Sequence, residues 1–129
     1  MADEISATFG LTITNGNLLE KITQAVYTVD QSFAGRGGHV QWIGTSEEVI
    51  DVGDIGVGSV MTEGYCFLKN VEDSGGNFVT IGPESSGAMV GFMRLNPGEI
   101  AYLRIEPDTI MRAQADTGDV RLDVNLYAN

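Results

Sequence analysis

The chain has 129 residues, of which 43% are hydrophobic, and its 18 acidic and 7 basic side chains give a formal charge of −11. A chain of this length can bury roughly two-thirds of its unfolded surface, so it needs neither a metal nor a disulfide to fold. The negative field repels phosphate groups, which argues against nucleic-acid partners and anionic membrane surfaces. We expect a single domain over residues 1–129, with residues 1–6 as an extended N-terminal arm.

The N-terminal segment predicts a β-hairpin. Residues 5–14 alternate apolar and polar side chains, which is typical of a half-buried strand. Asn15-Gly16 then supplies the commonest short hairpin signal. In residues 18–29 the spacing of Leu18, Ile22 and Val26 also fits a helix, whereas β-branched and aromatic residues crowd the second half. We expect a strand here, because the segment follows a hairpin turn; a helix is the alternative.

The middle of the chain predicts short strands between glycine-rich loops. Residues 32–38 are expected to form a loop, and residues 39–44 and 48–52 to form strands. The glycines of residues 53–58 have a spacing similar to phosphate-binding loops, but no helix pattern and no lysine follow directly, so we expect a loop between sheets. Residues 65–71 are apolar on both sides apart from Lys69 and Asn70, which predicts a central strand.

The C-terminal part predicts a series of antiparallel strands. We expect a hairpin loop over residues 72–77, a strand at 78–81 and a loop at 82–88, after which residues 89–95 lead into the final hairpins. Three further strands, over residues 99–105, 109–115 and 119–127, each follow a turn signal. In the last strand one side is entirely apolar and is expected to face the core: Val120, Leu122, Val124 and Leu126.

These elements predict the fold class. About nine to eleven strands in a chain of this length leave little room for helix. We therefore expect an all-β protein, an antiparallel β-sandwich with Greek-key or jelly-roll crossings. The aromatic residues are spread over nearly every strand, and we expect most of them in the core. Trp42 and Tyr127 are the exceptions, because their polar tips suit an interface.

The sequence predicts no reaction centre. His39 is the only imidazole and Cys66 the only thiol. A catalytic triad needs a nucleophile beside a base, and a zinc site needs three or four ligands. Cys66 lies in an apolar run and is expected to be a small buried hydrophobe; an interchain disulfide or a reactive thiol are its alternatives. We therefore expect no catalytic residue, no cofactor and no metal ligand.

Carboxylates are numerous enough to leave two alternatives open. A glycosidase needs two carboxyl groups in a cleft with aromatic side chains that stack on sugars, and Trp42 is the only tryptophan available. A calcium ion could bind oxygen ligands of Asp51, Asp54 or the turn from Asp116 to Asp119, but their spacing lacks the EF-hand pattern. Solvated turns are the simpler interpretation of these residues.

Several segments carry a resemblance to a known group of proteins. They are Gly64 to Val71, Asn77 to Gly82, Met93 to Glu99 and Ile110 to Ala115. Together they resemble small β-rich virion proteins of tailed bacteriophages, and are most similar to capsid decoration, or cement, proteins. The likeness covers roughly residues 64–127, and the first half of the chain adds only a compatible strand pattern. The resemblance implies a β-sandwich and no catalytic residues.

The resemblance also implies a role and partners. We expect a chain made in the host cytoplasm, in keeping with its acidic first residues, that binds the major capsid protein on the capsid exterior as a homo-oligomer, with a trimer favoured. The rival interpretations are a carbohydrate-binding module and a tail or head–tail connector protein. Candidate contacts lie in the N-terminal segment (residues 1–6) and in the glycine loops of residues 35–38 and 53–58. The single residues that we select as candidate contacts are Arg36, Gly37, His39, Trp42, Asp54 and Tyr127.

Overall fold

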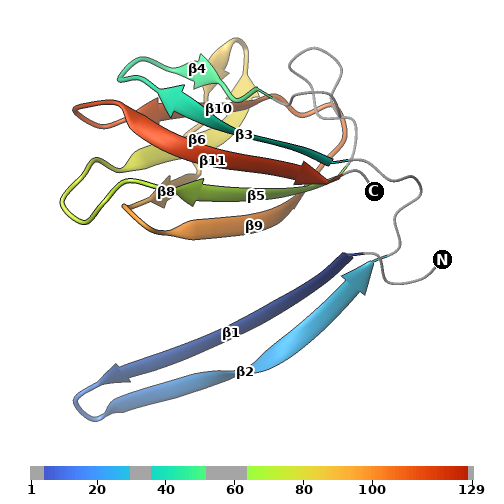
Figure 1. Ribbon diagram of the computed structural model, residues 1–129, viewed down its shortest axis with the longest axis vertical. Coiled ribbons are helices and arrows are strands. Elements are labelled where there is room, and N and C mark those ends of the chain that lie inside the picture. Colours follow the sequence, from blue (N-terminus) through green and yellow to red (C-terminus); the bar gives the residue numbers. More distant parts are fainter. Residues whose placement is uncertain (1–4, 30–35, 52–63, 128–129) are drawn as a thin grey trace. The chain divides into compact units, whose positions relative to one another are not determined.

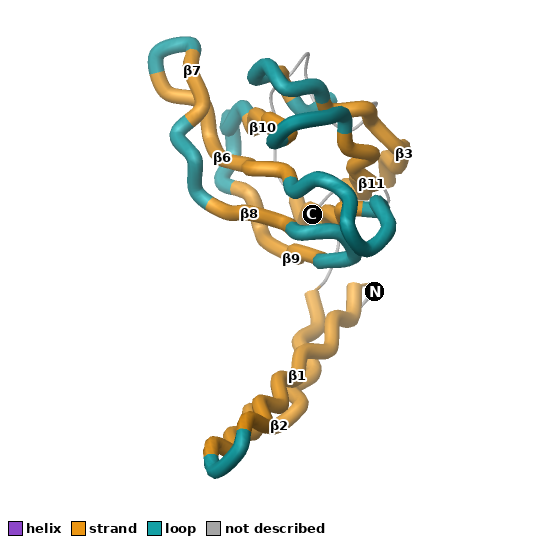
Figure 2. Tube along the Cα trace, turned by 90° about the vertical axis from the view of Figure 1, so that its left-hand side faces the viewer, coloured by secondary structure: helices purple, strands orange, loops and turns teal. Residues whose placement is uncertain are grey.

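The computed structural model describes residues 5–29, 36–51 and 64–127 of the protein (Figure 1). Within these ranges all regular secondary structure is β, and no helix occurs (Figure 2). No helix there is long and apolar enough to cross a membrane. The prediction of an all-β, antiparallel β-sandwich is confirmed.

The chain divides into two compact units. The described part of the first is a two-stranded antiparallel hairpin of β1 (Ile5–Asn15) and β2 (Leu18–Val29). The second unit contains β3 to β11 and forms the sandwich. Of the segment expected as an N-terminal arm, Ile5 and Ser6 open β1, and residues 1–4 lie outside the described ranges.

Residues 18–29 form the second strand of a hairpin with a bulge. Gly16, with a φ of 57°, takes the first central position of the turn, where a type II′ turn requires a positive φ. Leu11 then pairs with Ile22, but Phe9 pairs with Ala25, so Gly10 lies opposite two residues of β2. This β-bulge shifts the alternation of β2 by one residue. Residues 18–29 are thus a bulged strand, and the helix alternative is wrong.

The sandwich consists of two antiparallel sheets whose strands are not sequential neighbours. The first has the order β3 (Arg36–Ile43), β11 (Val120–Tyr127), β5 (Gly64–Asn70) and β9 (Ile100–Ile105). The second has the order β4 (Glu48–Val49), β10 (Met111–Ala115), β6 (Val79–Ser85) and β7 (Ala88–Met89), with β8 (Met93–Leu95) also paired to β6. The chain crosses repeatedly between them, as a Greek-key topology requires.

The core is aliphatic and lies between the two sheets. The inward side of β11 is completely buried, as predicted: Val120, Leu122 and Val124 are 0% exposed and Leu126 is 1% exposed. Residues of the second sheet complete the core, among them Val79, Ile81 and Ala113. None of the described aromatic side chains belongs to this cluster, and only Tyr65 among them is buried, at 3% exposure, so the expectation that most aromatics form the core is wrong.

Two segments predicted as loops are strands. Residues 36–38 belong to β3, because they pair with residues 125–127 of β11. Residues 82–85 extend β6, and Gly82 is there for close packing rather than for a turn: a Cβ at this position would lie 1.9 Å from the carbonyl oxygen of Val90. The backbone of residues 90–92 follows β6 closely, with amides of Val90 and Phe92 donating to carbonyls of Pro83 and Ile81.

Asn70 ties the two sheets together at one end of the sandwich. Its side chain is fully buried, and its Nδ2 donates to the carbonyl oxygens of Asn77 and Leu95, both at 3.0 Å. Its Oδ1 accepts from the amide of Glu72 at 3.0 Å. Its backbone carbonyl accepts from Gly98, whose φ of 83° completes the turn after Pro97. This turn is the turn signal that was expected before the strand at residues 99–105.

Replacing Asn70 tests this junction. Asn70→Ala leaves two buried carbonyls and one amide without the hydrogen bonds they make in the wild type. We expect a loss of about 2–4 kcal/mol in the free energy of unfolding, because each unsatisfied buried group costs about 1–3 kcal/mol. Equilibrium urea unfolding measures it, with the exposed Asn96→Ala as control. An unfolding midpoint equal to that of the wild type would refute the role of Asn70.

Candidate functional site

Most predicted contact residues lie on one pair of neighbouring strands. Residues 36, 37, 39 and 42 are all in β3, and Tyr127 ends β11. The register pairs Arg36 with Tyr127 and Trp42 with Arg121, so the predicted residues follow the β3–β11 pair along its length. For Arg36 and Gly37 the structure describes the backbone alone, and Asp54 lies outside the described residues.

The two sides of β3 separate His39 from Trp42. His39 pairs with Val124, which is 0% exposed, and shares its side of β3 with the buried Ile43. Its Nε2 atom is buried and makes no hydrogen bond within the part of the chain that the structure describes. Trp42 and Val40 face the opposite way. The side of this sheet that faces away from the core is here called the outer face. Of these two residues, only Trp42 lies on it.

The most exposed part of the outer face lies around Trp42. Trp42 is 61% exposed and Val40, two residues before it on the same side, is 56% exposed. The Arg121 guanidinium lies 5.8 Å from the centre of the Trp42 ring, within the range of a cation–π contact. This arrangement gives an edge strand a flat apolar surface with a cation beside it.

Glu72 holds Arg121 in place. The Arg121 Nε donates to Glu72 Oε1 at 3.0 Å, and the Arg121 backbone amide donates to the same oxygen at 2.9 Å. The hydrogen bonds from the side chain and the backbone of Arg121 lower the pKa of Glu72 below its ordinary value of 4.5. Glu72 itself follows Asn70, to which its amide donates. The loop after β5 thereby fixes the cation that accompanies Trp42.

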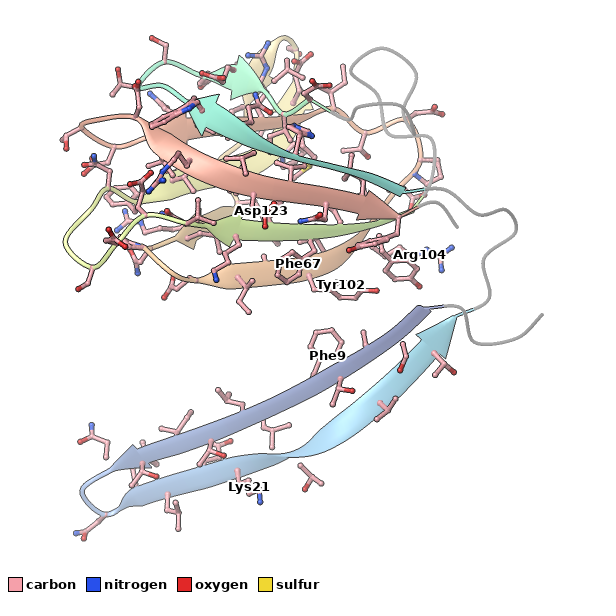
Figure 3. The ribbon with its side chains drawn as sticks, in the orientation of Figure 1. Phe9, Lys21, Phe67, Tyr102, Arg104 and Asp123 are labelled. Carbon is pink, nitrogen blue, oxygen red and sulfur yellow. The ribbon has the colours of Figure 1, made fainter. Side chains whose placement is uncertain are left out.

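A second group on the outer face was missed by the sequence analysis. Tyr65 of β5 stacks on Tyr102 of β9, with ring centres 5.5 Å apart and planes inclined by 10°. The Arg104 side chain lies near the Tyr65 ring, and its Nη1 donates to the Tyr65 hydroxyl at 3.5 Å. Figure 3 shows Tyr102 and Arg104 on β9, and Phe67 on β5. Lys69 could have indicated this group. It lies on the same side of β5 as Tyr65 and Phe67, and its charge indicates that this side faces away from the core.

The outer face does not bring Trp42 and Tyr127 together. Trp42 lies opposite Arg121, and Tyr127 lies at the far end of β11. Six residues of strand span about 20 Å. A single sugar ring cannot reach both side chains, so the two residues do not form one aromatic platform.

The described residues offer little reactive chemistry. Cys66 is buried at 3% exposure, and burial raises its pKa to about 12, in keeping with the prediction of a small core residue. No group of three His, Cys, Asp or Glu residues able to hold a metal ion occurs in ranges 5–29, 36–51 and 64–127. A hollow of about 290 Å³ is lined by Phe78, Thr80, Gln114 and Arg94, and the Arg94 guanidinium lies 3.8 Å from the Phe78 ring centre.

Comparison with protein-family models, with curated proteins and with solved structures returned no match. The functional interpretation therefore depends on the surfaces of this chain and on the sequence resemblance of residues 64–127.

The Glu72–Arg121 pair predicts a pH dependence of stability. The pKa of Glu72 is lower in the folded state than in the unfolded state, so its ionised form stabilises the fold above about pH 4.5. This contribution is lost as the pH falls through the lower, folded-state pKa. We expect Glu72→Gln to be less stable than the wild type near neutral pH, with a difference that shrinks below pH 4.5.

Urea unfolding over a series of pH values measures this difference, with the exposed Glu106→Gln as a control for the loss of one carboxylate. A Glu72→Gln profile that runs parallel to the wild-type profile at every pH would show that the pair does not stabilise the fold.

Proposed function

We propose that this chain is a non-enzymatic structural protein of a tailed-bacteriophage virion, a capsid decoration (cement) protein. It binds the lattice of major capsid subunits on the capsid exterior and stabilises the head, and it does so as a homo-oligomer, with a trimer favoured. It is made in the host cytoplasm and joins the particle there.

The surface around Trp42 carries this proposal. Trp42 and Val40 expose apolar area on an edge strand, and Glu72 holds the Arg121 cation beside them. Trp and Arg are the residue types most often found at the centres of protein interfaces. A face of this kind suits contact with another folded protein. The rest of the chain is strongly acidic, which keeps the unbound protein soluble and limits non-specific association.

The segments that carry the sequence resemblance support the fold part of the proposal. Gly64 to Val71 includes β5, Asn77 to Gly82 begins β6, and Ile110 to Ala115 contains β10. Met93 to Glu99 contains β8 and the turn that closes on Asn70. The likeness therefore involves central strands of both sheets and the junction between them. Copies arranged on a symmetric lattice gain avidity from their neighbours, so a small contact surface suffices for each copy.

The carbohydrate-binding alternative has one observation in its favour, the exposed Trp42. Sugar rings stack on exposed aromatic side chains, but the other candidate, Tyr127, lies about 20 Å away along the strands. A glycan array with the purified chain distinguishes this alternative. Immunogold labelling of particles distinguishes a capsid location from a tail or connector location.

Co-sedimentation with capsid shells tests the proposed function. We expect the wild-type chain to pellet with shells assembled from the major capsid protein. Trp42→Ala should lower the affinity roughly tenfold or more, as loss of an interface anchor does. Phe92→Ala is the matched control, since Phe92 is 75% exposed but lies just before β8 in the other sheet.

A wild-type chain that stays in the supernatant would contradict the proposed function. A wild-type chain that pellets together with an equally bound Trp42→Ala variant would contradict the assignment of the surface alone.

A further inference from the structure

The β1–β2 hairpin carries an apolar face that the sandwich core does not include. Leu11 lies opposite Ile22 in the register, so the two side chains share one face, and Ile13 and Leu18 follow on the same side. Leu11 is 49% exposed, and Leu18 and Ile22 are each 55% exposed. Figure 3 shows Phe9 and Lys21 on opposite faces of the hairpin. The face defined by Leu11, Ile13, Leu18 and Ile22 is here called the apolar face.

The opposite face of the hairpin is mostly polar. Thr12 pairs with Lys21, Thr14 pairs with Leu19, and Thr8 pairs with Val26. This face therefore carries threonines with two apolar residues, Leu19 at 73% and Val26 at 65% exposure. One apolar and one polar face are the pattern of a sheet that is covered on a single side.

Two strands are too few to stabilise such a sheet. Within the described residues, β1 and β2 pair only with each other. A two-stranded hairpin in water is marginally stable, and three or more strands with a covered apolar face are needed for independent stability. A hairpin with 11 and 12 residues in its strands, as found here, therefore gains stability when another layer covers its apolar face.

The distribution of charge along the chain indicates what covers the apolar face of the hairpin. Glu20 and Lys21 are the only charged residues from 5 to 29, so the hairpin is neutral and the whole charge of −11 belongs to the rest of the chain. Two copies of an acidic protein repel each other least where they are neutral. A basic partner, in contrast, would be favoured by acidic side chains, and on the apolar face Glu20 alone supplies one. The hairpin thus matches a second hairpin better than it matches a basic surface.

We infer that copies of this chain associate by packing the apolar faces of their β1–β2 hairpins against one another. Each copy presents the same apolar face, so the contact is isologous and joins two copies across a two-fold axis. A face of about 36 Å by 10 Å is small for a protein interface, so we expect the association to be weak and to depend on protein concentration. It is a dimer contact, separate from the trimer that the proposed function favours.

Sedimentation velocity of the full chain without shells, from low to high micromolar concentration, tests this inference. We expect the mass to rise from 13.8 kDa to a multiple of it with concentration. Leu11→Ser with Ile22→Ser should weaken the association roughly tenfold or more, because the pair lies on the apolar face. Leu19→Ser with Val26→Ser is the matched control on the polar face and should change it less than about threefold.

Urea unfolding of both double variants confirms that the sandwich remains folded. A chain that stays at 13.8 kDa at every concentration would overturn the inference, as would equal effects of the two double variants. A chain that stays monomeric but still pellets with shells would overturn the inference and leave the proposed function intact. An oligomer that fails to pellet would contradict the proposed function and support the inference.

Discussion

The buried amide of Asn70 is the interaction on which the sandwich and its surface both depend. Its Nδ2 reaches carbonyls of Asn77 and Leu95, and so joins β5 of one sheet to the end of β8 in the other. Its Oδ1 holds the amide of Glu72, whose carboxylate in turn holds Arg121 beside Trp42. A buried polar group with all its hydrogen bonds made specifies one arrangement of its neighbours. The exposed face around Trp42 is therefore set by an atom inside the protein.

Alternation of side chains predicted much of this fold, because a strand with one buried face leaves a clear pattern. The period of β11 places its four apolar residues at 0–1% exposure, and the turns at Gly16 and Gly98 follow from the positive φ that glycine tolerates. The pattern failed where two backbones meet closely. Gly82 indicated a loop, but it allows residues 90–92 to lie against β6. A local sequence signal cannot distinguish these two uses of glycine.

The surface was harder to predict than the fold. The sequence analysis selected Trp42 and residues near it because of polar tips and nearby glycines, and the register places most of them along β3 and β11. It could not separate His39 from Trp42, since that depends on which side of β3 faces the core. It expected Tyr65 and Tyr102 in the core; Tyr65 is indeed buried, at 3% exposure, but it stacks on Tyr102 rather than joining the aliphatic cluster. Only the pairing of β5 with β9 brings these two rings together.

The two units of the chain have different physical tasks. The sandwich buries its own core, whereas the hairpin strands over residues 5–29 have no net charge and expose Leu11, Leu18 and Ile22. Hydrogen exchange at low and high protein concentration tests this division most directly. The amides of residues 5–29 should gain protection as the concentration rises, while those of β5 and β11 should not change. Equal protection of the hairpin amides at every concentration would contradict the account.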